Sequence, residues 1–456
     1  MNDFWSGAGV DLHLEPDPAD GRRSGLERAL RDAVRDGRLA PGTRLPATRR
    51  LAADLGVSRG TAKAAYDQLV AEGYLTARQG SGTRVAALPP TPGAEAPRAD
   101  ARTGAPRFDL RPGSPDVGAF PVAAWLRALR RAIATAPSPA YDYGDPRGRI
   151  ELRTALSGYL GRARGVLAPP ERIVITSGYV QGLALLTRVL DGAAVAMEDP
   201  GLPFHQEVVR RNGKTVVPVP VDAHGIRAGA LGEAAAVVVT PAHQYPTGVT
   251  LHPERRRAIG DWARARGGIV VEDDYDGEFR YDRQPVGALQ GMAPGQVVYL
   301  GTASKTLGPA LRLGWMVLPA HLVDAVADAK LHSDHHTETI GQLALAELID
   351  SHAYDRHVRA CRLRYRRRRD RLLDRLGPRP GVRGIAAGLH ALIEVDDEAE
   401  ALARAEAEGL AVGALGDHWH SPRPGRPQGL VVGYGTPRER AYPQALEALA
   451  KVLEGE

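Results

Sequence analysis

The sequence predicts an α/β protein in which a large domain with a covered, mostly parallel sheet follows a small helical domain. From about residue 108 onward, short apolar runs alternate with helical stretches, which is the pattern of strands joined by helices. Residues 20–86 instead combine short helical segments with a glycine-rich hairpin. Residues 87–107, rich in Ala, Pro and Gly, predict an extended linker. We therefore expect domains at 20–86 and 108–456, with a small carboxy-terminal subdomain at about 380–456.

Composition limits the class of protein. At 456 residues and 43% hydrophobic residues, the chain can form a large core and at least one smaller domain. Cys361 is the single cysteine, which excludes an intrachain disulfide, and residues 1–20 lack the basic start and apolar centre of a signal peptide. No apolar run approaches the roughly twenty residues that span a bilayer. We expect a soluble protein of the reducing cytoplasm.

The net charge of +5 is concentrated near the amino terminus. Residues 21–88 hold thirteen Arg and Lys against six Asp and Glu, so the remainder of the chain carries a charge of −2. Such an asymmetry is typical of a nucleic-acid-binding module, although a merely soluble surface would show it equally well.

The amino-terminal segment has the spacing of a helix-turn-helix. Apolar residues at helical spacing predict an amphipathic helix over 22–37, and a second, short helix is expected over 48–55. Gly56 and Val57 form a turn, and Ser58 caps a third helix that runs to about Glu72. A hairpin follows, and its glycine-rich tip is a candidate wing.

Over nearly all of residues 22–86, these motifs resemble the winged helix-turn-helix domain of the GntR family of bacterial regulators. The resemblance implies binding to double-stranded operator DNA, with the wing in the minor groove. The residues that it places against DNA are Arg49, Ser58, Arg59, Thr61 and Lys63, together with Gln79 and Gly80 of the wing. A helix amino terminus with small hydroxyl side chains suits phosphates, and an arginine can contact a guanine edge. Gly60 departs from the usual threonine. The alternative is that these side chains form ordinary solvated helix faces.

The large domain is predicted from seven apolar runs, several of which are too apolar to have one face in water. Ligands gather at the carboxyl ends of the strands in such sheets. The turn TSGYVQG at 176–182 ends one strand and opens a helix, so its amides are candidates to cradle a phosphate. The strand candidates are RIVIT, AVAME, TVVPVPV, AVVVT, GIVVED, VVYLG and LRLGWMVL, with two further strands at 388–395 and 430–434.

Lys305 and Asp273 point to pyridoxal phosphate (PLP) chemistry. Lys305 lies in GTASKTLGPALRLGW, thirty-two positions after Asp273 in IVVEDDYDGEF. A lysine amine forms a Schiff base with the cofactor aldehyde, and a carboxylate holds the pyridine nitrogen protonated, which makes the ring an electron sink. The alternative is a surface lysine and an unrelated acid at the end of a strand.

The order of TSGYVQG, PAHQYPTG, EDDYDGEF, Lys305 and Arg312 resembles the fold type I aminotransferases across residues 108–456. It resembles above all the aminotransferase-like half of MocR-type regulators, which carry the same fusion to a GntR domain. The resemblance implies that Lys305 binds PLP as the Schiff base, that Asp273 pairs with the pyridine nitrogen, and that Tyr275 donates to the ring hydroxyl. The residues that it implies for the phosphate are Thr302, Arg312, Gly178 and Tyr179, with Tyr143 reaching the cofactor of a neighbouring subunit in a homodimer.

Two positions depart from the aminotransferase pattern. Val431, in GLVVGYG, stands where these enzymes carry the arginine that binds the substrate carboxylate. Leu202, in EDPGLPF, stands where a tyrosine often lies near the cofactor. Both departures weaken the case for efficient transamination, and neither prevents cofactor binding.

The sequence therefore favours a transcriptional regulator whose second domain senses PLP or a PLP-amine adduct. The missing arginine favours sensing of the cofactor alone, and thereby control of vitamin B6 metabolism. Enzymatic turnover is not expected, although slow half-reactions are compatible with the residues. The alternatives are an active PLP-dependent aminotransferase with an appended DNA-binding module, and a DNA-binding protein with a relic domain.

Two other clusters receive no functional assignment. A helix expected over 352–378 holds six arginines between 362 and 369, which we interpret as mainly solvated above an apolar stripe of Leu363, Leu372 and Leu373. His332, His335 and His336 lack the neighbouring cysteines or carboxylates of a metal site, so no metal is predicted.

Overall fold

The computed structural model describes residues 21–78, 82–87, 106–281, 286–377, 381–420 and 425–455. The chain divides into two compact units, Met1–Thr103 and Gly104–Glu456. Within the described ranges, none of the helices has the length and apolar character needed to cross a bilayer.

The first unit is a small helical domain with a hairpin. Its core is made by leucines and alanines that recur at helical spacing, among them Leu26, Leu30 and Leu69. The side chain of Ser58 accepts a hydrogen bond from the Thr61 amide and so caps the third helix. The elements are α1 (Arg22–Arg35), α2 (Thr48–Asp54), α3 (Arg59–Ala71), and the antiparallel strands β1 (Leu75–Arg78) and β2 (Gly82–Val85). The wing tip with Gln79 and Gly80 lies outside the described residues.

The second unit is built on an eight-stranded sheet in the order β4-β11-β10-β9-β8-β5-β6-β7. The five central strands, from β10 to β6, are parallel, whereas β11, β4 and β7 pair antiparallel. The carboxyl ends of the central strands therefore meet at one edge of the sheet. The bounds are β4 (Ile173–Thr176), β5 (Ala194–Asp199), β6 (Thr215–Asp222), β7 (Gly225–Ile226), β8 (Ala236–Val239), β9 (Ile269–Asp274), β10 (Val297–Thr302) and β11 (Gly314–Val317).

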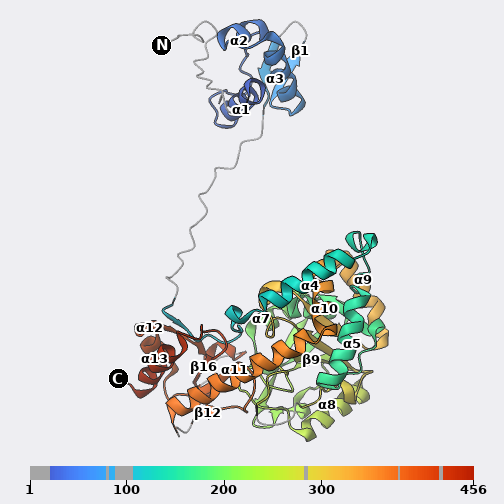
Figure 1. Cartoon of the computed structure of the whole chain (residues 1–456), viewed down its shortest axis with the longest axis vertical. Helices are drawn as coiled ribbons and strands as arrows, with labels where there is room; N and C mark the ends of the chain where they lie inside the picture. The colour runs from blue at the N-terminus through green and yellow to red at the C-terminus, as the bar shows by residue number, and fades with distance from the viewer. Residues whose placement is uncertain are drawn as a thin grey trace. The chain divides into compact units, whose positions relative to one another are not determined.

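Helices cover both faces of this sheet, as the apolar strands require (Figure 1). Successive residues of β11 show the alternation, since Trp315 packs in the core with α5 and α10, whereas Met316 packs with α6 and α9. The helices are α4 (Val122–Thr135), α5 (Ile150–Arg164), α6 (Tyr179–Val189), α7 (Pro203–Arg211), α8 (Pro253–Arg266), α9 (Val323–Asp334) and α10 (Thr339–Asp350).

A smaller sheet in the order β12-β13-β16-β15 forms the carboxy-terminal subdomain. The long helix α11 runs from the large sheet into this subdomain (Figure 1). The segment that follows the linker also joins it, because β3 pairs in parallel with β14. The bounds are α11 (Ala353–Leu376), α12 (Glu398–Ala407), α13 (Tyr442–Glu454), β3 (Phe108–Asp109), β12 (Val382–Arg383), β13 (His390–Glu394), β14 (Leu410–Ala411), β15 (Gly413–Ala414) and β16 (Gly429–Gly433).

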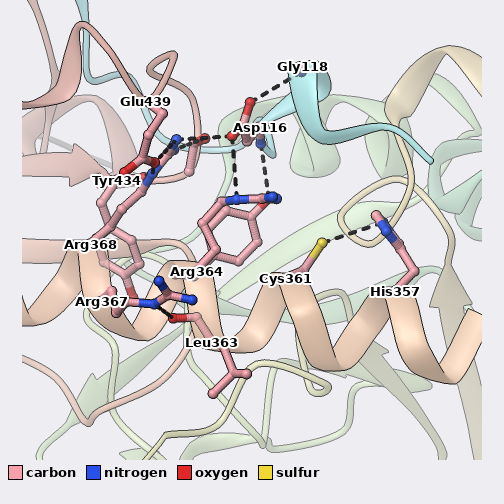
Figure 2. Close-up of polar contacts among 12 residues, drawn as sticks. Asp116, Gly118, His357, Cys361, Leu363, Arg364, Arg367, Arg368, Tyr434 and Glu439 are labelled. Atoms are coloured by element: carbon pink, nitrogen blue, oxygen red, sulfur yellow. Dashed lines mark hydrogen bonds and ion pairs between the residues drawn. The ribbon is translucent and has the colours of Figure 1, made fainter. Parts of the chain in front are cut away.

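One arginine of α11 is part of the core. The side chain of Arg368 is 1% exposed and lies between Asp116 and Glu439 (Figure 2). Its Nη2 is 2.9 Å from Asp116 Oδ2 and 3.0 Å from Glu439 Oε2. The sequence predicted Leu363 as part of the apolar stripe of this helix, which was wrong, because Leu363 is 51% exposed. The buried stripe instead consists of Tyr354, Val358, Cys361, Tyr365, Arg368, Leu372 and Leu376.

Candidate functional site

A cavity of about 420 Å³ opens at the carboxyl ends of the central strands, where parallel sheets place their ligands. Asp273 reaches it from β9 and Lys305 from the turn after β10, and these two strands are paired neighbours. Of the residues predicted for the cofactor, those that line the cavity are Lys305, Asp273, Tyr275, Thr302, Arg312 and Tyr179. Gly178 packs against the guanidinium of Arg312. Tyr143 is 78% exposed and is absent from the lining of this cavity.

Burial sets the charge states of the lysine and the carboxylate. The pKa of Lys305 is lowered because burial penalises the ammonium, with Asp276 and Asp273 opposing the shift. The same burial raises the pKa of Asp273 well above its ordinary value, and the Lys305 charge opposes that shift. The Lys305 amine donates a hydrogen bond to the Gly113 carbonyl. The Lys305 amine and the Asp273 carboxylate therefore share one desolvated cavity.

Arg312, Thr302 and Ser304 form a part of the cavity lining that is suited to an anion. Arg312 has a left-handed backbone (φ 53°), which is uncommon for a residue other than glycine. Its guanidinium packs on Gly178, where an added Cβ would lie 3.2 Å from both terminal nitrogens. The Thr302 hydroxyl donates to Ser304 Oγ at 2.8 Å. A guanidinium, hydroxyl groups and the start of α6 are the donors that phosphate prefers.

Tyr275 is held by residues that the sequence analysis did not single out. Its hydroxyl donates to the His243 carbonyl at 3.0 Å, and His243 Nδ1 lies 2.8 Å from Asp276 Oδ2. Among the described residues, His243, Asp276 and His390 form the one cluster with the spacing of metal ligands. His243 and Asp276 are hydrogen-bonded to each other, and the His243 carbonyl accepts from Tyr275. We therefore assign these two residues to the positioning of Tyr275. Both lie in motifs that the sequence had marked, PAHQYPTG and EDDYDGEF.

His205 and Glu198 also line the cavity, and the sequence analysis did not identify them. His205 Nδ1 lies 4.0 Å from Asp273 Oδ2, and burial lowers the pKa of His205 to about 3, so its imidazole is neutral. Glu198 lines the same cavity and accepts a hydrogen bond from the Thr240 hydroxyl at 2.5 Å. Glu198 is the first residue of the EDPGLPF motif, and His205 directly follows the motif. Leu202 of this motif also lines the cavity, so proximity to Leu202 was the available signal.

Val431 lies outside the cavity lining. It is fully buried on β16, in an apolar cluster with Leu392 and Leu415. Of the three histidines at 332, 335 and 336, His335 and His336 contact the ring of Tyr143.

The predicted DNA-facing residues lie at the amino-terminal ends of α2 and α3. Arg49, Ser58, Arg59 and Lys63 are exposed, and Thr61 is half-buried with its hydroxyl 2.8 Å from Ser58 Oγ. Lys63 forms an ion pair with Asp67 at 2.7 Å. This surface thus offers a capped helix start with an arginine at its first turn.

Comparison with known proteins agrees with both units. Residues 23–85 match the family described as bacterial regulatory proteins, gntR family, and residues 108–412 match aminotransferase class I and II. The HTH-type pyridoxine biosynthesis transcriptional regulator PdxR of Corynebacterium glutamicum is 34% identical over 94% of this chain and 95% of its own. The probable rhizopine catabolism regulatory protein MocR of Rhizobium meliloti is 35% identical over 75% of this chain and 74% of its own.

The chain belongs to the MocR-type regulators of the GntR family. The kynurenine aminotransferase of Pyrococcus horikoshii superimposes on 77% of this chain and 92% of its own, with a TM-score of 0.70 and 26% identity. The predicted fold class is therefore confirmed: this MocR-type chain carries a winged helix-turn-helix domain and a fold type I aminotransferase-like domain.

Proposed function

We propose that this MocR-type regulator binds PLP at Lys305 and that occupancy of this site changes its affinity for double-stranded operator DNA. The observation that carries the proposal is the convergence of Lys305, Asp273 and Arg312 on one cavity. The amine suits the cofactor aldehyde, the buried carboxylate suits a protonated ring nitrogen, and the arginine suits the phosphate. When bound, PLP supplies an aldehyde that captures amines and a ring that withdraws electrons. Residues of the cavity therefore suit the aldehyde, the ring nitrogen and the phosphate of PLP.

We assign the remaining contacts as follows. Tyr275 would turn its single hydroxyl hydrogen from the His243 carbonyl to the ring hydroxyl, and the neutral imidazole of His205 lies 4.0 Å from Asp273. Thr302, Gly178 and Tyr179 complete the phosphate site beside Arg312. Leu202, an aliphatic side chain, lines the cavity where related proteins often have a tyrosine, so this position would contribute no aromatic stacking to the cofactor ring.

We further propose that the chain acts as a homodimer in the cytoplasm. Tyr143 is 78% exposed, and α4 leaves the apolar side chains of Val122 and Ile133 58% and 50% exposed. A second copy that covers this surface would place Tyr143 near the neighbouring cofactor. The similarity to PdxR leads us to include vitamin B6 supply among the processes under control of this regulator.

The test is binding of the purified apo-protein to DNA from its own upstream region, with and without PLP. We expect a change in DNA affinity on addition of PLP. Linkage requires the same DNA to change the PLP affinity by the same factor, which a reverse titration measures. Equal DNA affinity with and without bound PLP would contradict the proposal.

Measurement of catalytic turnover distinguishes this proposal from the alternative of an active aminotransferase. Val431 leaves no guanidinium at the position where aminotransferases bind the substrate carboxylate, so an amino-acid substrate has no anchor there. We expect no sustained production of keto acid from amino donors. Production over many cycles that depends on Lys305 would favour the enzyme instead.

Replacement of Arg59 by alanine is expected to weaken operator binding by roughly 1–3 kcal/mol, because Arg59 opens the predicted recognition helix. The matched control is Arg23→Ala, which removes the same charge from α1, where Arg23 pairs with Glu27 at 2.7 Å. Fluorescence anisotropy at fixed salt measures both variants. Equal losses in the two variants would indicate a contribution of net charge alone.

The rate of PLP capture should rise with pH and reach half of its maximum below the ordinary lysine pKa of about 10.4. Only the neutral amine attacks an aldehyde, and burial lowers the pKa of Lys305. Asp276 opposes that shift, so Asp276→Asn should move the midpoint to lower pH, whereas Asp417→Asn, at an exposed site, should not. The growth of cofactor absorbance after mixing gives the rate. A midpoint at or above that of free lysine would refute the expectation.

A further inference from the structure

A second recess lies between α5, α11 and the segment that follows β9. Its cavity volume is about 190 Å³, and among the described residues it shares no lining residue with the cofactor cavity. Arg162 lines it from α5, and Arg359 and Arg362 line it from α11. Tyr159 and Glu278, which are 2% and 7% exposed, form its buried part. Two helices therefore bring three guanidinium groups to a hollow that the cofactor does not occupy.

The guanidinium groups of this recess have few protein partners. Within the described residues, the side chains of Arg162 and Arg359 form no ion pair and no hydrogen bond. Arg362 donates from Nε to the Glu278 carbonyl at 2.8 Å, which leaves its two terminal nitrogens for a ligand. Guanidinium groups pair readily with anions. Groups that come from two helices suit the tetrahedral oxygens of a phosphate better than the planar pair of a carboxylate.

The two acids of the lining do not neutralise these arginines. Among the described residues, neither acid forms an ion pair with them, and Asp355 Oδ2 instead lies 3.3 Å from His352 Nδ1. Tyr159 donates to Glu278 Oε1 at 3.2 Å. Burial, reinforced by the charge of Asp274, raises the pKa of Glu278 to about 7. Part of the Glu278 population is therefore neutral near neutral pH, and the recess keeps an excess of positive charge.

The size of the recess favours a phosphate that carries a small organic body. A cavity of about 190 Å³ holds on the order of ten water-sized groups, whereas a phosphate ion has five heavy atoms. Ala163 and Val358 add apolar surface that an organic body would contact. We propose that this recess binds a small phosphate monoester, with the guanidinium groups of Arg162, Arg359 and Arg362 on the phosphate.

One short segment connects this recess with the cofactor cavity. Asp273 and Tyr275 line the cofactor cavity, and Gly277 and Glu278 line the recess. Arg164 donates from Nη1 to the Gly277 carbonyl at 3.1 Å and so ties this segment to α5. A ligand that binds one arrangement of the segment more tightly changes the affinity of the other cavity by a reciprocal factor. The bound monoester should therefore change the affinity for PLP, which makes the recess a regulatory site.

Isothermal titration calorimetry of the full-length protein with glycerol phosphate tests the site. Glycerol phosphate should bind more tightly than inorganic phosphate, because the organic body adds contacts with the apolar part of the lining. Glycerol alone should not bind, and the dicarboxylate succinate should bind more weakly than glycerol phosphate. No binding of glycerol phosphate, or equal or tighter binding of inorganic phosphate or succinate, would overturn the proposal.

Variants assign the binding to this recess. Arg162→Leu and Arg359→Leu, at exposed positions of different helices, should each weaken the binding of glycerol phosphate roughly ten-fold or more. Arg366→Leu, at an exposed position of α11 paired with Asp370, should bind as the parent does. Arg312→Ala, in the cofactor cavity, should also retain the binding. Binding that is lost in Arg312→Ala and kept in both leucine variants of the recess would place the ligand in the cofactor cavity instead.

Glu278→Gln gives a test that a loss of folding cannot imitate. Glutamine keeps an acceptor for Tyr159 and removes the negative charge. Binding of glycerol phosphate should therefore tighten several-fold at about pH 8, where most of Glu278 is ionised because its pKa is about 7. Unchanged or weaker binding in this variant would contradict a phosphate beside Glu278.

A spectroscopic titration with PLP measures the coupling, which rests on the proposed function, whereas the recess itself does not. Glycerol phosphate, at a concentration that saturates only the parent, should change the PLP dissociation constant of the parent and not that of Arg162→Leu. Equal changes in both would indicate competition at the cofactor cavity, and this result or no change would exclude the regulatory role. If PLP does not load, the proposed function fails while the calorimetric test still decides on the recess.

Discussion

Replacement of Lys305 by alanine is expected to abolish covalent retention of PLP and the response of DNA binding to it. Lys305 is the lysine of this cavity, and alanine has no nitrogen to bond with the aldehyde. Borohydride reduction followed by mass measurement of the denatured chain should find the cofactor on the parent and none on the variant. DNA affinity without cofactor should stay within about two-fold of the parent, since the change lies in the second compact unit.

The control for this experiment is Lys451→Ala. Lys451 lies on α13 with its side chain 57% exposed, so the variant also lacks one lysine but keeps the cavity intact. It should retain both the reduced adduct and the DNA response. A full response of DNA binding to PLP in Lys305→Ala would exclude Lys305 as the sensing group.

Replacement of Arg368 by methionine is expected to destabilise the second unit by about 3–5 kcal/mol, as loss of one partner from a buried ion pair typically does. Methionine fills part of the volume but leaves Asp116, 9% exposed, without its ion pair to Arg368 (Figure 2). The backbone carbonyls of Tyr434 and Gly435 lose their donor as well. Urea unfolding followed by tryptophan fluorescence reports on this unit, because four of the five tryptophans lie within it.

The matched control lies two residues earlier on the same helix. The Arg366 side chain is 59% exposed and is 3.9 Å from Asp370, a weak surface pair. Arg366→Met should change the free energy of unfolding by no more than about 0.5 kcal/mol. Similar losses in the two variants would show that Arg368 contributes to helix α11 rather than to the buried network.

Local patterns in the sequence were sufficient for the fold. The apolar runs of the strands cannot be solvated on either face, so they predict a covered parallel sheet before any contact is known. Ser58 after the Gly56–Val57 turn likewise predicts the start of α3, because capping is a local interaction. The resemblance to fold type I enzymes then placed Lys305 and Asp273 in one cavity.

The acidic stretch EDDYDGEF shows what local patterns leave open. Asp273 lines the cavity, whereas the neighbouring Asp274 forms an ion pair with Arg164 at 2.6 Å on the buried side of the sheet. Glu272 accepts backbone hydrogen bonds from Leu289 and Gln290. The sequence shows only adjacent carboxylates, and alternation along the strand together with the packed partners separates their roles.

The sequence by itself predicted the two-domain α/β architecture and the helix-turn-helix, because each depends on local periodicity or on a short motif, whereas most of the candidate cofactor residues came from the resemblance to fold type I aminotransferases. The tertiary structure alone decided that Arg368 is a core residue while Leu363 is exposed. It also decided that His390, 85 residues from Lys305 in the chain, lines the cavity of Lys305. Burial and hydrogen-bond satisfaction are properties of residues distant in sequence, so only the folded chain fixes them.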